Sequence, residues 1–336
     1  MKAYVVKAKV KLGKLPSKEI CRDLLYEDSL ERKLDIIRAN KSEIPNIYSK
    51  KDVEIFLSNS LYDDLNSFLK FLKGEEKNFF IKYISKFELQ LIQLIVQAIL
   101  NEHLKDSLDI IKREKFSQNI NVSKDDDFQT FVEKSKSTRY YRTLYPFLNE
   151  NMQKDSIIFL ISNSLNKFYY RDLLEETKKL QKNLGKELRE FIGREIDIFN
   201  IEMLFRLKNY FILNDYEIFN YLIEGGKYLK TEDLKKLSKL SLDKVKEKIL
   251  GSPYNSLFNN SSNFYKAKQD LLSDNSKRLN NSKYDLLKLI YIVDMMEISN
   301  KNIISMLEFD ETFDKDEKKR YIIKRWQNGC RKNALS

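Results

Sequence analysis

The stretch GREIDIFNIEMLFRLKNY, residues 193–210, decides how this chain is expected to fold. Read as a helix, it is apolar over most of its circumference, because two apolar stripes run side by side at helical spacing. The stripes consist of Ile196, Phe199, Met203, Leu207 and Tyr210, and of Ile198, Ile201 and Phe205. Four polar residues are threaded between them: Glu195, Asp197, Asn200 and Arg206. The pattern predicts a helix that is largely buried, so these polar groups need a specific purpose.

The spacing of the polar residues suggests that purpose. Glu202 and Arg206 are four residues apart, in the favourable order for an ion pair along one helix face. Asp197 and Asn200 are three residues apart and share another face. An Asn amide carries two donors and one acceptor, so it can bridge helices or hold a backbone group. We interpret these residues as a buried network that fixes helix register, in preference to direct partner contact.

Composition favours long helices around a sizeable core. The chain has 336 residues, of which 42% are hydrophobic, and only eight Gly and four Pro punctuate it. Two cysteines near opposite ends, Cys21 and Cys330, are too few for a disulfide framework and suggest a reducing compartment. The opening residues lack the apolar core of a secretory signal. The most apolar run, residues 87–100, is interrupted by three Gln and predicts a buried helix rather than a membrane span.

Positive charge is concentrated at the two ends of the chain. The net charge is +11, residues 1–22 carry +6 and residues 315–336 carry another +6. The residues between them are therefore close to neutral. Basic ends of this kind can attract nucleic acid, anionic lipid or an acidic protein, or they can simply be solvated helix ends.

A Glu-apolar motif followed five residues later by an amide occurs three times. Glu195 precedes Asn200, Glu297 precedes Asn302, and Glu88 precedes Gln93 in a looser version. A second motif, a hydroxyl residue two positions before a Tyr, precedes each of these helices. Its three copies are Ser60 to Tyr62, Thr138 to Tyr140, and Ser252 to Tyr254. We expect the hydroxyl to cap a helix start and the Tyr ring to anchor that helix.

The order of the two motifs is the same in all three thirds of the chain, which predicts three helical units of related sequence. Approximate boundaries place these units at residues 1–112, 113–225 and 226–336, with interleaving allowed. The expected fold class is all-α.

Residues for catalysis or cofactor binding are scarce in this sequence. His103 is the only histidine, so a zinc site or a Ser-His-Asp arrangement has almost no material. The EGGKYLK segment, residues 224–230, lacks the upstream Gly and the Ser or Thr of a phosphate-binding loop. We therefore predict no active site, no metal and no cofactor.

With these motifs in view, nearly the whole chain resembles the C subunit of the prokaryotic A/V-type rotary ATPases, the counterpart of the eukaryotic d subunit. Residues 194–210 are similar to the most recognisable helix of that family, and the Gly225-Gly226 turn within residues 221–237 is similar to its Gly-Gly turn. Residues 131–144 and 251–257 resemble its helix starts. The opening, residues 4–17, resembles the family's basic start. One departure from the family pattern is Gln93, which stands where an Asn is expected.

This resemblance implies a funnel of three helical units with pseudo-threefold symmetry and no catalytic step of its own. Such a protein sits peripherally on the cytoplasmic face of the membrane, as a socket between the proteolipid ring and the central-shaft subunits D and F. It passes torque between ATP hydrolysis or synthesis and the transport of protons or sodium ions. No homo-oligomer is expected.

Basic residues at the chain ends and on the central helix are the candidates for membrane-side, rotor or cavity-side contacts. They are Lys7, Lys9, Lys11, Lys319, Arg320, Lys324, Arg325, Arg206 and Lys208. The alternative is a basic all-helical nucleic-acid-binding protein, but the chain lacks Arg-rich recognition helices and has a nearly neutral centre.

Overall fold

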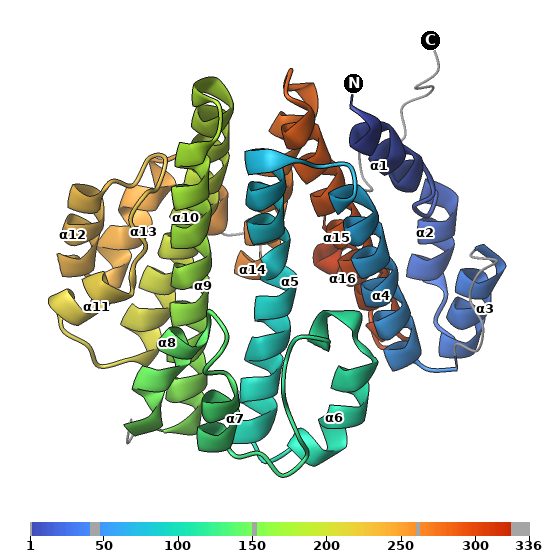
Figure 1. Cartoon of the computed structure of the whole chain (residues 1–336), viewed down its shortest axis with the longest axis horizontal. Coiled ribbons are helices and arrows are strands. Elements are labelled where there is room, and N and C mark those ends of the chain that lie inside the picture. Colours follow the sequence, from blue (N-terminus) through green and yellow to red (C-terminus); the bar gives the residue numbers. More distant parts are fainter. Residues whose placement is uncertain (1, 41–47, 150–152, 260–262, 324–336) are drawn as a thin grey trace. The chain divides into compact units, whose positions relative to one another are not determined.

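The computed structural model describes residues 2–40, 48–149, 153–259 and 263–323. Every regular element in these ranges is an α-helix or a short 3-10 helix, and none is a strand (Figure 1). The predicted all-α class is therefore confirmed. The chain divides into two compact units: a terminal unit of residues 1–71 and 241–336, and a middle unit of residues 72–240. The three-unit division and the pseudo-threefold funnel stay predictions.

The terminal unit is built around its longest helix. Its elements are α1 (Ala3–Gly13), α2 (Lys18–Tyr26), α3 (Leu30–Asn40), α4 (Lys50–Leu69), α13 (Leu242–Leu250), η3 (Asn255–Leu257), α14 (Phe264–Lys277), η4 (Arg278–Asn281), α15 (Asp285–Glu308) and α16 (Lys315–Tyr321). Helices α1, α2, α4, α14 and α16 all pack against α15. Helices near the start of the chain and helices after residue 263 thus share one core, although they are far apart in sequence.

The middle unit is organised by three long helices. Its elements are α5 (Gly74–Leu100), α6 (Leu104–Arg113), η1 (Lys115–Ser117), α7 (Phe128–Lys134), α8 (Tyr141–Leu144), η2 (Tyr145–Asn149), α9 (Lys154–Lys179), α10 (Lys182–Tyr210), α11 (Asp215–Tyr221) and α12 (Thr231–Lys239). Helix α9 packs against both α5 and α10, and α11 and α12 follow α10 (Figure 1). Helix α10 contains the stretch from which the fold was predicted.

The apolar run at residues 87–100 forms the second half of α5, as expected for a buried helix. Its apolar side chains are mostly buried, whereas Gln90 and Gln97 face solvent. The whole of α5 is long and apolar enough to cross a membrane by length and composition, but half of its most apolar window is buried within the protein. Core helices of soluble proteins pass the same test.

Several helices begin where a short polar side chain satisfies the first backbone N–H groups. Ser49 and Asp52 form a reciprocal capping box at the start of α4, and Asn214 and Glu217 do so at the start of α11. Asp127 accepts a hydrogen bond from the Thr130 N–H at 2.8 Å and starts α7 in the same way.

The hydroxyl-x-Tyr motif has a different role from the one predicted. Thr138 and Ser252 each accept a hydrogen bond from the N–H of the Tyr two residues later, at 3.3 and 3.1 Å, and so form a turn rather than a helix cap. The prediction of a helix start at Ser60 is wrong, because Ser60 lies in the middle of α4. That helix already begins at the Ser49 capping box, and no Gly or Pro interrupts it before Tyr62.

The Tyr residues after these turns are anchors in their own units. Tyr140 is buried and its hydroxyl donates a hydrogen bond to Glu88, so a residue of the first motif contacts a residue of the second. Burial and the Glu88 carboxylate raise the pKa of Tyr140. Tyr254 is also buried, whereas Tyr62 is only half-buried.

Two lysines lie within the apolar core of the terminal unit, which is formed mainly by α2, α3, α4 and α15. Lys33 has no exposed surface and donates a hydrogen bond to the carbonyl of Phe309. Lys318 is nearly as buried and pairs with Asp28. Burial lowers the pKa of Lys33, and the charge of Lys318 lowers it further.

This burial predicts how the stability of the chain depends on pH. The pKa of Lys33 is lower in the folded protein than in the unfolded chain, so its charged form costs free energy in the fold. That cost diminishes as the pH rises from the folded pKa toward the unfolded value of 10.5. We expect the free energy of unfolding of the native protein to rise relative to that of Lys33→Met across this range. Urea titrations at increasing pH measure the difference, and Lys236→Met, at an exposed position, should show no such trend.

Candidate functional site

The polar residues of α10 hold a chain segment against the helix. Asn200 has no exposed surface, and its amide nitrogen donates to the carbonyl of Ile223 at 2.7 Å. Its amide oxygen accepts from the N–H of the same Ile223 at 2.8 Å. One side chain thereby satisfies both backbone groups of a buried residue that belongs to no helix. We call this arrangement an amide clip.

Asp197, one helical turn before Asn200, fixes the turn that follows Ile223. Its two carboxylate oxygens accept the N–H groups of Tyr228 and Leu229 at 2.8 and 3.1 Å. The turn needs glycine here: Gly225 has a φ of +104°, and a Cβ on Gly226 would lie 2.0 Å from the Asp197 carboxylate. Residues 222–230, which we call the clipped turn, are therefore held by buried side chains of α10.

The terminal unit repeats the amide clip. Asn302 of α15 accepts the N–H of Ile323 at 2.9 Å and donates to the carbonyl of Ile323 at 3.3 Å. The clipped Ile follows the Asn by 21 residues here and by 23 residues in the middle unit. Gln93, the third member of the predicted series, donates to the carbonyl of Ser162 at 3.4 Å. The amide position thus binds backbone in all three copies, although only the two Asn residues make a two-sided clip.

The glutamates of the repeated motif do not share a partner. Glu88 accepts from Tyr140, and Glu297 pairs with Lys301 at 2.7 Å. Glu195 is half-buried. Burial raises the pKa of Tyr170, and the charge of Glu195 raises it further. The predicted pair between Glu202 and Arg206 is present at 3.1 Å.

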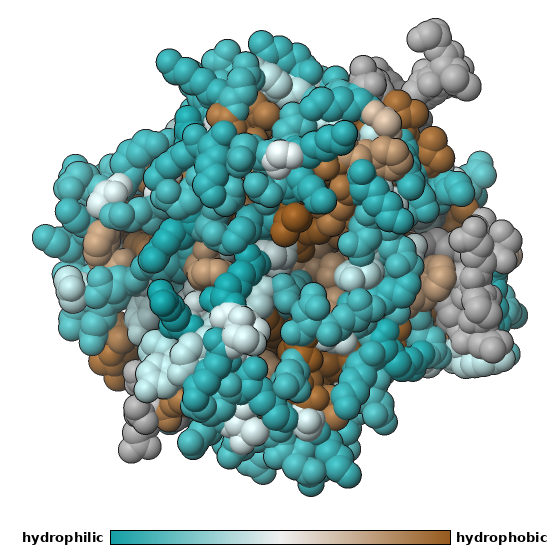
Figure 2. All heavy atoms as spheres, viewed as in Figure 1, coloured by the Kyte–Doolittle hydropathy of each residue, from teal (hydrophilic) through white to brown (hydrophobic). Residues whose placement is uncertain are grey.

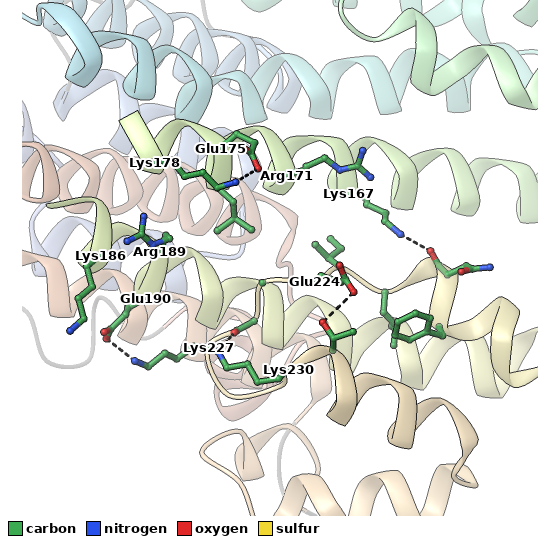
Figure 3. Close-up of a pocket in the computed structure, with 18 residues that line it drawn as sticks. Lys167, Arg171, Glu175, Lys178, Lys186, Arg189, Glu190, Glu224, Lys227 and Lys230 are labelled. Atoms are coloured by element: carbon green, nitrogen blue, oxygen red, sulfur yellow. Dashed lines mark hydrogen bonds and ion pairs between the residues drawn. The ribbon is translucent and has the colours of Figure 1, made fainter. Parts of the chain in front are cut away.

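A cavity of about 820 Å³ opens beside the clipped turn, within the middle unit. Figure 3 shows side chains that converge on it from α9, from α10 and from the turn. Its basic residues are Lys167, Arg171, Lys178, Lys186, Arg189, Lys227 and Lys230. Its acidic residues are Glu175, Glu190 and Glu224, and its apolar residues include Leu174, Phe219, Leu222 and Ile223. We call this site the basic cavity.

Only part of the positive charge in the basic cavity is neutralised within the protein. Lys227 pairs with Glu190 at 2.9 Å, and this hydrogen bond holds the pKa of the Glu190 carboxyl below its ordinary value. Lys178 pairs with Glu175 at 2.6 Å. Lys167 donates to the carbonyl of Asn220 at 2.6 Å; burial lowers its pKa, and the Arg171 charge lowers it further. The excess of cations makes the cavity an anion-attracting site.

The partner-binding residues predicted from sequence lie elsewhere. Lys9, Lys319 and Arg320 are exposed, whereas Lys7 lies over the Phe71 ring and Lys11 pairs with Asp64 at 2.6 Å. Lys324 and Arg325 lie outside the described residues. None of the five described residues is among those that line the basic cavity.

The two candidates on α10 also make internal contacts. Arg206 pairs with Glu202 and lies over the Phe159 ring, with about half of its side chain exposed. Lys208 donates to the carbonyl of Ser238 at 2.7 Å, and burial lowers its pKa. Sequence reasoning assigned basic residues of α10 to partner contact but missed Lys186 and Arg189, which line the cavity.

Three large, exposed side chains gather around the connection between α10 and α11. Tyr210, Ile212 and Tyr216 are 74%, 105% and 73% exposed, which is unusual for three large apolar side chains so close in sequence. The face drawn in Figure 2 consists mainly of hydrophilic side chains with small hydrophobic patches between them. Within the described residues, no group of three His, Cys, Asp or Glu side chains is placed to hold a metal ion.

Comparison with known families agrees with the resemblance drawn from the motifs. The family model described as ATP synthase (C/AC39) subunit matches residues 5–308. Since this match covers most of the chain, the protein belongs to the ATP synthase C/AC39 subunit family.

Individual relatives carry the same description at moderate identity. The chain is 26% identical to the A-type ATP synthase C subunit of Methanococcoides burtonii, over 63% of this chain and 59% of that protein. It is 28% identical to the Methanosarcina mazei protein of the same name, over 57% of this chain and 53% of the relative. With the Archaeoglobus fulgidus protein, also of that name, the identity is 29% over 72% of this chain and 71% of the relative. The chain thus matches little more than half the length of the first two proteins.

The amide clips predict a large loss of stability on truncation. Asn200→Ala leaves a buried N–H and a buried carbonyl without partners, at a cost of about 1–3 kcal/mol for each group. We expect the free energy of unfolding to fall by about 2–5 kcal/mol, and Asn302→Ala to behave similarly. Asn209→Ala on the same α10 helix is the matched control, because Asn209 is exposed and makes one local bond to the Phe205 carbonyl. Equal losses for Asn200→Ala and Asn209→Ala in denaturant titrations would contradict this role.

Proposed function

We propose that this protein joins shaft to ring in the central stalk of an A/V-type ATPase. In this role it is a non-catalytic socket that connects the central-shaft subunits D and F to the membrane proteolipid ring. It works at the cytoplasmic face of the membrane, attached peripherally through the complex. Torque then passes through it between ATP hydrolysis or synthesis and the movement of protons or sodium ions.

The family match over residues 5–308 is the observation that carries this proposal. The relatives from Methanococcoides burtonii and Archaeoglobus fulgidus are both named as the C subunit of an A-type ATP synthase. The alternative of a nucleic-acid-binding protein receives no support from any of these similarities.

The internal architecture of each unit suits a part that transmits torque. Long helices deform little along their axes, and α5, α9, α10 and α15 each span more than twenty residues. The amide clips attach non-helical segments to α10 and α15. Without these hydrogen bonds, the non-helical segments would be the first parts of each unit to deform under load. Stiffness within a unit is therefore built from buried hydrogen bonds as well as apolar packing.

Copurification from native membranes tests the proposed function directly. We expect the affinity-tagged full chain, expressed in its native host and extracted in mild detergent, to bring down the proteolipid ring and the shaft subunits, as identified by mass spectrometry. Recovery of the tagged chain without either group would contradict the proposal. Recovery of the shaft without the ring would contradict the socket role specifically.

The exposed residues Lys9 and Arg320 predict a salt-dependent contribution to this association. Lys9 and Arg320 are both exposed in the terminal unit, so Lys9→Gln with Arg320→Gln removes two surface charges without disturbing the core. We expect the double variant to be released from the membrane complex at lower salt, with affinity reduced about threefold to tenfold at low ionic strength. The matched control, Arg142→Gln with Lys236→Gln, also removes one Lys and one Arg from exposed positions. Identical release curves for the two double variants would show that the basic ends do not contribute.

A further inference from the structure

The basic cavity is the strongest feature of the described structure that the coupling role does not by itself explain. It lies wholly within the middle unit, between α9, α10 and the clipped turn, and its volume of about 820 Å³ is large enough to hold several side chains of a ligand. Figure 3 shows that its charged residues come from three separate segments, which face one another across the opening.

The walls of the basic cavity are held in place by buried contacts. The clipped turn is fixed by Asp197 and Asn200, and the Lys227 N–H donates to the carbonyl of Gly193 at 3.0 Å. At the other end, a Cβ on Gly185 would lie 2.3 Å from the carbonyl oxygen of Thr177, so this glycine lets α10 pack tightly against α9. A preformed site of this kind loses little entropy when it binds a ligand.

Three cations of the basic cavity are available to a ligand. Arg171 on α9 and Lys186 and Arg189 on α10 are exposed, and within the described residues no acidic side chain forms an ion pair with them. They stand on two different helices, so together they present positive charge from two walls. Guanidinium groups in particular bind carboxylates through two parallel hydrogen bonds.

The remaining lining decides which kind of anion fits. Leu174 and Phe219, both half-buried, provide apolar surface beside the charged walls, and burial of this surface favours a ligand with apolar side chains. Glu190 and Glu224 line the same space, so a ligand whose negative charges are spaced apart can avoid them more readily than a compact, highly charged phosphate group. Spaced carboxylates with apolar groups between them match this pattern, because each carboxylate can approach a cation while the apolar groups cover the floor.

We propose that the basic cavity is a docking site for an acidic, amphipathic segment of a partner protein. The carboxylates of that segment bind Arg171, Lys186 and Arg189, and its apolar side chains pack on Leu174 and Phe219. The inference depends on the proposed function only in expecting the segment to belong to a neighbouring protein of the same complex.

A synthetic peptide tests this site independently of the complex. The probe is a fluorescein-labelled peptide with Glu and Leu at helical i, i+4 spacing, and the reference peptide has Gln in place of every Glu. We expect the full chain to bind the Glu peptide, as measured by fluorescence anisotropy, and to bind the Gln peptide far more weakly. Arg171→Gln with Lys186→Gln should weaken binding of the Glu peptide about tenfold. Arg142→Gln with Lys236→Gln, exposed elsewhere in the same unit, should leave it unchanged.

Several results would overturn the proposal. Equal loss of binding in the two double variants would show that only general surface charge is involved. Equal binding of the Glu and Gln peptides would remove the role of the carboxylates. Tighter binding of inorganic tripolyphosphate than of the Glu peptide, lost in the Arg171→Gln and Lys186→Gln variant, would assign the cavity to a phosphate ligand instead. The two double variants change residues of the middle unit only, so a negative result with the peptide is distinguishable from a failed copurification.

Discussion

The requirement that buried backbone groups be hydrogen-bonded governs the structure of both units. Segments that leave a helix and return across an apolar surface cannot satisfy their own N–H and carbonyl groups. Asn200 and Asn302 supply the missing partners from the helix side, each binding both groups of a single Ile. Such unsatisfied groups cost about 1–3 kcal/mol each, against a total stability of about 5–15 kcal/mol for a typical domain.

This constraint explains why α10 can be apolar over so much of its surface and still carry polar residues. Asp197 and Asn200 are fully buried, but backbone groups of the clipped turn form hydrogen bonds with both side chains. These two residues therefore avoid the free-energy cost of burying an unpaired polar group. The same contacts position the turn that forms one wall of the basic cavity. Packing, turn geometry and surface charge in the middle unit are therefore coupled through one helix.

Sequence reasoning succeeded where a local pattern has a single physical solution. The stripes of α10, the scarcity of Gly and Pro, and the spacing of Glu202 and Arg206 led to a helical protein with a specific ion pair, and both are present. It failed at Ser60, because a hydroxyl before a Tyr resembles a cap only if no stronger cap lies upstream. The partner of Asn200 could not be predicted, because Ile223 lies in a loop whose path depends on tertiary packing.

The basic cavity was missed for a related reason. Its cations come from positions between 167 and 230, and each of them, viewed within its own segment of sequence, looks like an ordinary solvated Lys or Arg. The concentration of charge arises only when the α9–α10 pair and the clipped turn are folded together. The basic ends of the chain, by contrast, stand out in sequence because their charges are closely spaced, yet Lys11 is already paired with Asp64 and Lys7 lies over an aromatic ring. Density of charge along a chain is thus a poor guide to charge available for binding, which depends on how many acids the fold brings to the same place.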